Sequence, residues 1–193
     1  DIASNFTWRT LDKKVANKTA LQEYCNLPVR EDVPIYAIIT RLASHKGLDL
    51  VKHVFEELLQ ADLRFVILGS GEWEFETFFY EMAQKYPQKV GLKLGFKPQL
   101  AHRIYAGADI FLMPSQSEPC GLAQMVALRY GTIPIVRETG GLNDTISDSG
   151  DGEGNGFTFR NYNAHEMEDA VWRAIAGYAD KDGGDMLRKR AMN

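Results

Sequence analysis

Cysteine is scarce in this sequence, with only Cys25 and Cys120 among 193 residues. Two cysteines are too few for a disulfide framework, and their spacing does not match that of zinc ligands. No apolar run approaches the roughly 20 residues that a membrane-spanning helix needs. A signal-peptide core is also missing from the first residues, DIASNFTWRTLDKK. We therefore expect a reducing, cytoplasmic setting and no membrane partner.

Positive charge is also in short supply. Lys and Arg total 22 against 26 Asp and Glu, which gives a net charge of -4. Proteins that bind nucleic acids normally carry a basic field, so this balance argues against a nucleic-acid partner. The length and the 45% hydrophobic content fit one domain with a full core, or two small ones.

From residue 35 onward, short β-rich runs alternate with segments of helical periodicity. The expected strands are 35–41, 64–69, 90–95, 109–115, 132–138 and 156–160, with helices between them and a closing helix at 164–179. The strands lack polar and apolar alternation, which is typical of a sheet covered by helices on both faces. The pattern predicts an α/β fold with a doubly wound, mostly parallel six-stranded sheet. Residues 1–30 are expected to form a helical lead-in to it.

The loops that follow these strands should carry the chemistry, because ligands of such sheets bind beyond the carboxyl ends of the strands. These loops are 40–47, 69–73, 95–97, 114–122 and 138–142.

The loop RLASHKG places Arg41 and Lys46 five residues apart at the end of the first strand. Two cations and the free N–H groups of a helix start form a natural receptor for a diphosphate. The alternative is that both are solvated surface charges. At this location we favour the phosphate receptor.

The segment SEPCGL places Glu118 ahead of a helix start, with Gly121 allowing close backbone approach. The N–H groups of about Cys120 to Ala123 open this helix toward an anion. Glu118 carries the same charge as a phosphate, so it suits sugar hydroxyls or a positive charge developing at an anomeric carbon. No histidine is placed by sequence to activate Cys120, which favours a buried small residue over a nucleophile.

Two further loops remain open to more than one interpretation. Phe96, after Gly95, either stacks on a nucleobase or caps the core. Gly140 and Gly141 in ETGGL either allow close approach to a ligand or simply form a turn.

Three motifs are misleading. GSG at 69–71 begins a dinucleotide fingerprint, but Glu74 stands where the third glycine belongs. DGEGNG at 151–156 begins like a calcium loop, but position twelve would be Tyr162. The acidic pair at 180–182 follows a helix rather than a strand, and we expect a solvated turn there.

Several stretches resemble the C-terminal half of glycogen and starch synthases. They are ITRLASHKGLDL, the block RIYAGADIFLMPSQSEPCGLAQMVALRYGTIPIVRETGGLNDT, and GNGFTF, and the similarity extends into ANKTALQEYCNLP in the lead-in. EPCGL followed by ALRYGT and TGGL is highly specific, whereas the Arg41 and Lys46 pair is shared more widely among GT-B glycosyltransferases. The resemblance implies a Rossmann-like sheet, the C-terminal half of a GT-B fold.

The resemblance also implies a role for each candidate residue, with Arg41, Lys46 and Glu118 as the catalytic set. The implied contacts are Arg41 and Lys46 for the diphosphate; Gly95 and Phe96 for the base; Glu118, Cys120 and Gly121 for the glucose; and the N–H groups of Leu122 and Ala123 for the distal phosphate. Many relatives use a second glutamate for the ribose where this chain has Met125. Its neighbour Gln124 is therefore counted among the nucleotide-binding candidates, together with Gly140 and Gly141.

The implied reaction is transfer of glucose, with retention, from ADP-glucose or UDP-glucose to the 4-hydroxyl of an α-1,4-glucan, without a metal or other cofactor. These synthases also have an N-terminal half with a Lys-Thr-Gly-Gly-Leu loop and a catalytic histidine, and nothing here matches it. We expect residues 1–193 to be a single donor-binding domain, inactive alone, without its acceptor domain. The alternatives are another retaining GT-B transferase or a nucleotide-binding module without catalysis.

Overall fold

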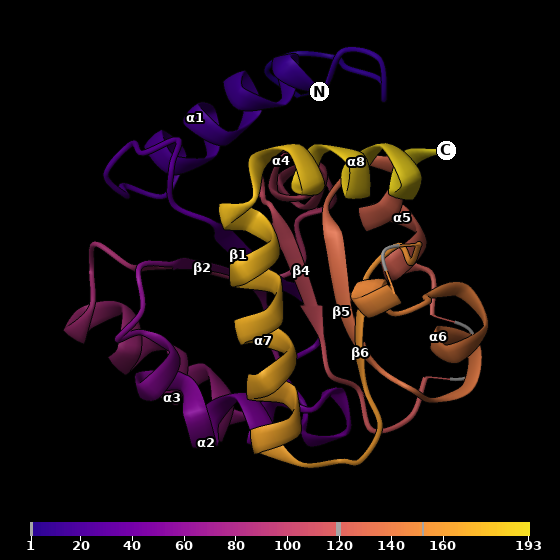
Figure 1. The fold of residues 1–193 in the computed structure, drawn as a ribbon. Coiled ribbons are helices and arrows are strands. Elements are labelled where there is room, and N and C mark those ends of the chain that lie inside the picture. The colour runs from indigo at the N-terminus through magenta and orange to yellow at the C-terminus, as the bar shows by residue number, and fades with distance from the viewer. Residues whose placement is uncertain (1, 119–120, 152) are drawn as a thin grey trace.

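The computed structural model describes residues 2–118, 121–151 and 153–193 and shows a sheet of six parallel strands (Figure 1). The strand order is β3-β2-β1-β4-β5-β6. The strands are β1 (Ile35–Ile39), β2 (Arg64–Gly69), β3 (Val90–Leu94), β4 (Ile110–Met113), β5 (Ile133–Arg137) and β6 (Phe157–Phe159). The predicted doubly wound α/β fold is confirmed, and the sheet is entirely parallel.

Helices cover both faces of this sheet (Figure 1). On one face α2 (Leu48–Leu58) packs against α3 (Trp73–Lys85) and α7 (Ala164–Ala179). On the other face lie α4 (Pro98–Gly107) and α5 (Ala123–Arg129). Successive residues of β1 alternate between two cores, Tyr36 and Ile38 on the α2 side and Ile35 and Ala37 on the α4 side. Burial on both faces explains why the strands read as continuous apolar runs.

A further helix, α8 (Lys181–Met192), begins within the stretch 180–182. These residues are exposed, as predicted, but the prediction of a turn is wrong because they start a helix. The carboxylate of Asp180 caps this helix by accepting the Gly183 N–H at 3.2 Å. Gly183 and Gly184 lower the intrinsic helix propensity here, which is why the pattern fails to predict a helix. Packing on α7 and α5, with Leu187 buried, outweighs that propensity.

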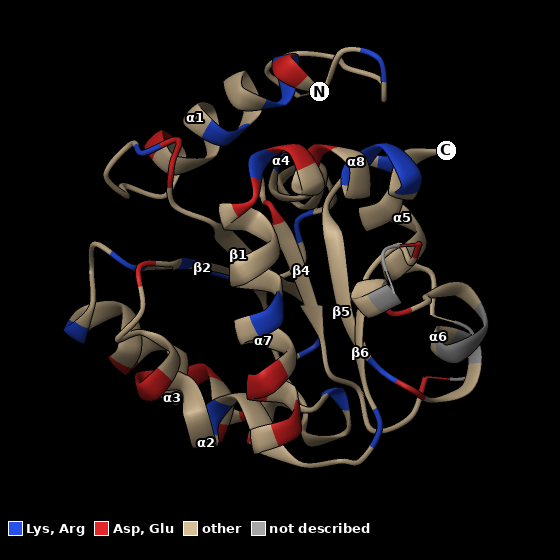
Figure 2. Ribbon diagram, in the orientation of Figure 1, with Lys and Arg blue, Asp and Glu red and all other residues tan. Residues whose placement is uncertain are grey.

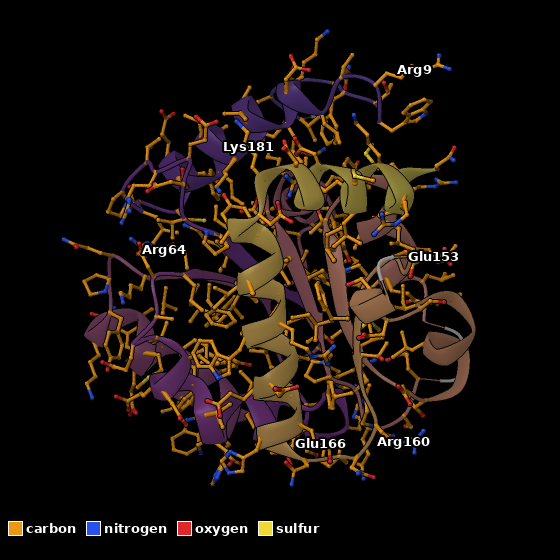
Figure 3. All side chains as sticks on the ribbon, viewed as in Figure 1. Arg9, Arg64, Glu153, Arg160, Glu166 and Lys181 are labelled. Carbon is orange, nitrogen blue, oxygen red and sulfur yellow. The ribbon has the colours of Figure 1, made fainter. Side chains whose placement is uncertain are left out.

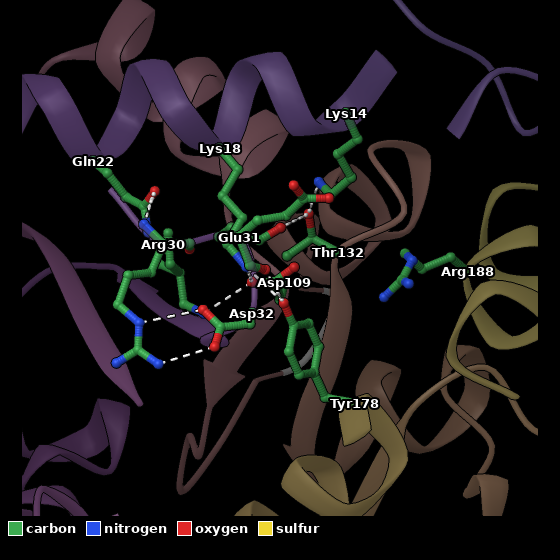
Figure 4. Close-up of polar contacts among 12 residues, drawn as sticks. Lys14, Lys18, Gln22, Arg30, Glu31, Asp32, Asp109, Thr132, Tyr178 and Arg188 are labelled. Carbon is green, nitrogen blue, oxygen red and sulfur yellow. Dashed lines mark hydrogen bonds and ion pairs between the residues drawn. The ribbon is translucent and has the colours of Figure 1, made fainter. Parts of the chain in front are cut away.

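The lead-in contains a 3-10 turn (Leu11–Lys13) and the helix α1 (Lys14–Tyr24), which packs on α4 at the amino-terminal edge of the sheet. Lys18 forms a buried ion pair of 2.9 Å with Asp109, whose carboxylate also accepts the N–H of Ile35 (Figure 4). The Lys14 ammonium reaches the carbonyl oxygens of Ala106 (2.7 Å) and Tyr130 (3.0 Å). Burial lowers the pKa of Lys14 to about 7. Two buried lysines thus bind the lead-in to the domain, at the edge opposite the predicted site.

The remaining short elements are α6 (Gly140–Thr145) and the 3-10 turns Ser44–Lys46 and Ser149–Asp151. Within the part of the chain that the structure describes, no helix combines the length and the apolar character needed to cross a membrane.

Candidate functional site

The strand order reverses between β1 and β4. From β1 the chain proceeds outward to β2 and β3, and from β4 it proceeds the other way to β5 and β6. The loops after these two neighbouring strands therefore lie at the point where the strand order reverses, at the carboxyl edge of the sheet, which is where ligands of doubly wound sheets bind. Both of these loops were predicted to carry site residues.

A glycine joins the two loops. Gly47 has φ +79° and lies so close to the end of β4 that a Cβ atom would stand 2.0 Å from the carbonyl oxygen of Pro114. The N–H of Gln116 also donates to the carbonyl of His45 at 2.9 Å. The β1–α2 loop and the β4–α5 loop consequently form one packed unit.

Within this unit, Lys46 and Glu118 form an ion pair. The Lys46 Nζ atom lies 2.9 Å from the Glu118 Oε2 atom, and the side chains are 22% and 14% exposed. Partial burial makes the pairing of the two charges important, because an unpaired charge there loses solvation without compensation. The structure thus brings together two of the three predicted catalytic residues.

Arg41, the third, leaves the end of β1 with an exposed side chain. Its guanidinium makes no hydrogen bond or ion pair with any residue that the structure describes. The nearby N–H of Ser44 is occupied by the Glu72 carboxylate at 3.0 Å. Arg41 therefore presents a positive charge, without a partner among the described residues, at the carboxyl edge of the sheet.

Gly121 follows Glu118 in the same loop and has φ +58°. A Cβ atom there would lie 3.0 Å from the Glu118 Cγ atom and 2.8 Å from the Gln124 Oε1 atom, so glycine permits this packing. Gln124 is fully buried, and its Nε2 atom donates to the Thr145 hydroxyl at 3.2 Å. Its side chain therefore lies beneath the loop rather than at its surface. Cys120 lies outside the described residues.

The backbone of α5 begins beyond this loop, with Leu122 as the N-cap and Ala123 as the first helical residue. The Leu122 side chain is 76% exposed. Gly140, with φ +46°, and Gly141 open α6 after Thr139, so the segment predicted as a turn or ligand approach begins a short helix.

Phe96 stands at the carboxyl end of β3. Its side chain is 90% exposed, so it does not cap the core and the capping interpretation is wrong. Gly95 has φ +118°, and its N–H donates to the carbonyl of Gly69 at 3.0 Å. β3 is two strand spacings, roughly 10 Å, from β1. An aromatic ring is thus available at the same edge as the ion pair, some distance along it.

Sequence reasoning missed Arg137 and Tyr162. Arg137 ends β5 and donates to the carbonyl oxygens of Ser115, Gln116 and Arg160. The Tyr162 hydroxyl donates to Asp49. A cation at a strand end was the one available signal for Arg137, and nothing local in the sequence indicates that it folds back toward the 114–118 loop.

The described residues contain no group of three or more His, Cys, Asp or Glu side chains suited to a metal ion. In the view of Figure 2, both signs of charge are interspersed over the helices rather than separated into one basic surface.

Comparison with known proteins places this geometry in a wider context. Residues 26–189 match the family described as glycosyl transferases group 1. The chain is 53% identical to the glycogen synthase of Anoxybacillus flavithermus over 100% of its length and 40% of the relative, and 54% identical to that of Bacillus anthracis over 99% and 40%. It therefore spans about two fifths of the length of these curated relatives.

Among solved structures, the catalytic domain of starch synthase IV from Arabidopsis thaliana, bound to ADP and acarbose, matches with a TM-score of 0.93 and 36% identity. That match covers 100% of this chain and 41% of the other. Sucrose-phosphate synthase from Thermosynechococcus elongatus, at 20% identity and a TM-score of 0.69 over 89% of this chain and 43% of the other, shares the fold.

Proposed function

The chain belongs to the group 1 family of glycosyl transferases, and we propose that it is the donor-binding domain of a glycogen synthase. In this proposal it binds ADP-glucose, with UDP-glucose as the alternative donor. Together with an acceptor domain it transfers glucose, with retention, to the 4-hydroxyl of an α-1,4-glucan. ADP is favoured because the starch synthase that is 36% identical to this chain was solved with ADP bound.

The observation that carries this proposal is the Lys46–Glu118 pair at the point where the strand order reverses. A donor of this class brings a diphosphate and a sugar to one place. Lys46, joined by Arg41, supplies positive charge for the diphosphate, whose negative charge grows as it leaves. Glu118 supplies hydrogen-bond acceptors for sugar hydroxyls and a negative charge beside the anomeric carbon.

Lys46 must change partner in this scheme. In the free protein its ammonium is neutralised by Glu118. A bound diphosphate offers it two further negative charges, and Glu118 is then released to face the sugar. The ion pair thus keeps both side chains close to where they would meet the donor, in loops that are packed together at Gly47.

The other candidate residues are assigned around this centre. We propose Gly95 and Phe96 for the base, Cys120 and Gly121 for the glucose, the N–H groups of Leu122 and Ala123 for the distal phosphate, and Gln124, Gly140 and Gly141 as further residues of the nucleotide site. Gln124 acts from beneath the loop, because its side chain is buried. No metal is required, since the two cations take its place. The proposed reaction fits a cytoplasmic protein.

Calorimetric titration with ADP, UDP and their glucose esters tests the proposal. We expect binding of ADP in the micromolar to millimolar range, with no elongation of glycogen by the chain alone, because in this proposal the acceptor binds to another domain. Failure of all four ligands to bind would remove the donor-domain assignment. Efficient elongation by the purified chain would show that the site is not divided between two domains.

A further inference from the structure

Arg137 connects the end of β5 with the loop that carries Glu118. Its Nε atom donates to the Ser115 carbonyl at 3.2 Å, and its Nη2 atom donates to the Gln116 carbonyl. The third donor, Nη1, reaches the Arg160 carbonyl at 3.3 Å; Arg160 is labelled at the lower edge of the molecule in Figure 3. One planar guanidinium therefore fixes two successive carbonyl groups of the 114–118 loop, an arrangement that lysine cannot reproduce.

Tyr162 connects the same arginine with the other loop. The Arg137 Cζ atom lies 5.8 Å from the centroid of the Tyr162 ring. The Tyr162 hydroxyl donates to the Asp49 carboxylate and lies 3.3 Å from the Ser44 carbonyl oxygen. Burial, with the hydrogen bond to Asp49, raises the pKa of Tyr162, so the phenol stays protonated and remains a donor.

Through these contacts the loop that carries Lys46 and the loop that carries Glu118 are joined in two ways. The two loops touch directly through the Gln116 N–H and the His45 carbonyl. They are also joined indirectly, from the 114–118 loop through Arg137 and Tyr162 to Asp49 in the first turn of α2. In the proposed site neither Arg137 nor Tyr162 contacts the donor, but both hold loops whose residues do.

We propose that Arg137 is a positioning residue, which holds the 114–118 loop in the conformation that places Glu118 beside Lys46 and so sets the geometry of the donor site. This inference rests on the proposed function as far as the donor is concerned. The restraint on the loop itself does not depend on any ligand. Small displacements of such a loop matter because binding and catalysis need the groups held close to their productive geometry.

Arg173 offers a matched control. Like Arg137 it donates three hydrogen bonds, here to Asp148, the Thr158 carbonyl and Asp169. It also lies over an aromatic ring, that of Phe157, at 5.9 Å. Arg173 lies on α7, and among the described residues none of its hydrogen bonds or ring contacts reaches either of the two loops. Replacing either arginine by methionine removes a similar set of contacts, but only one replacement releases the 114–118 loop.

The experiment measures hydrogen exchange of the Gln116 amide and ADP affinity in wild type, Arg137→Met and Arg173→Met. We expect Arg137→Met to speed Gln116 exchange about tenfold. It should also weaken ADP binding about tenfold, because the released loop leads into the Leu122 and Ala123 N–H groups that we propose for the distal phosphate; tenfold is the scale for losing a charge-assisted hydrogen bond. Arg173→Met should lower the melting temperature while leaving both quantities at wild-type values. Arg137→Lys should restore only part of either, because it lacks the fork.

Unchanged Gln116 exchange in Arg137→Met would overturn the proposal, and so would faster exchange with wild-type ADP affinity. If the wild-type chain bound no nucleotide, the proposed function would fail, whereas the exchange data would still decide whether Arg137 holds the loop. If Arg137→Met does not fold, Tyr162→Phe replaces it. That variant keeps the ring under Arg137 but removes the bond to Asp49, and a smaller change in the same direction is expected.

Discussion

The ammonium of Lys46 and the carboxylate of Glu118 meet at 2.9 Å although 72 positions separate them in the chain. The contact exists because β1 and β4 are neighbours and because Gly47 lets the loop after one strand pack on the end of the other. In the proposed function, an incoming diphosphate competes with Glu118 for Lys46. Replacing Lys46 and replacing Glu118 should therefore change ADP affinity in opposite directions.

Glu118→Gln should not weaken the binding of ADP. The substitution keeps the size of the side chain but removes the negative charge that neutralises Lys46 and repels phosphate. We expect ADP affinity to rise about threefold, which corresponds to the few tenths of a kcal/mol to about 1 kcal/mol of a partly exposed ion pair. Calorimetry on the wild type and the variant measures this. A large loss of ADP affinity would identify Glu118 as a nucleotide ligand instead.

Turnover should respond to the same substitution in the opposite direction. In a protein that joins this chain to an acceptor domain, we expect Glu118→Gln to lower kcat by about 10²-fold or more, the scale for losing one preorganised electrostatic group. The charge stabilises the transition state more than the bound donor, so KM should change little. Glucan elongation at saturating ADP-glucose is the measurement. Wild-type kcat in this variant would remove Glu118 from the reaction.

Arg41→Ala and Lys46→Ala should both weaken ADP binding, each by about 1.5–3 kcal/mol. They should differ in their effect on stability. Arg41 has no bonding partner among the described residues, so its loss should leave the melting temperature unchanged. Lys46→Ala leaves Glu118 half-buried and unpaired, so the melting temperature should fall.

The double variant Lys46→Ala/Glu118→Gln provides the control for that difference. Because it removes both charges, we expect it to recover most of the stability lost in Lys46→Ala without recovering ADP affinity. Equal melting temperatures for the single and the double variant would contradict an energetically significant ion pair.

Nucleotide binding should not depend on a divalent metal. In the proposed function, the positive charges of Arg41 and Lys46 take the role of a metal toward the diphosphate. We expect the ADP dissociation constant to be the same with excess chelator and with added magnesium. A hundredfold weakening on chelation would mean that the phosphate site is misplaced.

Lys14 should make the stability of the chain depend on pH. Its pKa is lowered by burial to about 7, whereas an unfolded lysine has a pKa of about 10.4. Between these values the unfolded chain binds one more proton than the folded chain, so the free energy of unfolding rises with pH, by up to about 1.4 kcal/mol per unit. Urea unfolding from pH 7 to pH 9.5 measures the slope, which should be smaller in Lys14→Met. Equal slopes would show that Lys14 keeps its proton.

The lead-in and the proposed site lie at opposite edges of the sheet, so Lys14→Met also tests whether the two edges are coupled. Lys14→Met should leave ADP affinity unchanged at pH 7, because its partners, three carbonyl groups and the Thr132 hydroxyl, lie near the amino ends of β4 and β5. A change in ADP affinity would indicate coupling between the two edges.

The local patterns of the sequence determined the strands, the helices between them and the loops that hold the site. Apolar runs of four to six residues can be read without the fold, because burial on both faces leaves a signature in each strand separately. Arg41, Lys46, Glu118 and Gly121 were recognisable from their places after strands. The wrong prediction at 180–182 has the same origin, since propensity is local and the packing that stabilises α8 is not.

Only the tertiary structure decided which of these residues meet. The pairing of Lys46 with Glu118 depends on the strand order, which no local pattern of charges specifies. The burial of Gln124, and the bonds by which Arg137 holds the carbonyl groups of Ser115 and Gln116, likewise follow from how the loops pack. Periodicity records the environment of one segment at a time. Contacts between distant segments are set by topology and close packing, and these become visible only when the chain is folded.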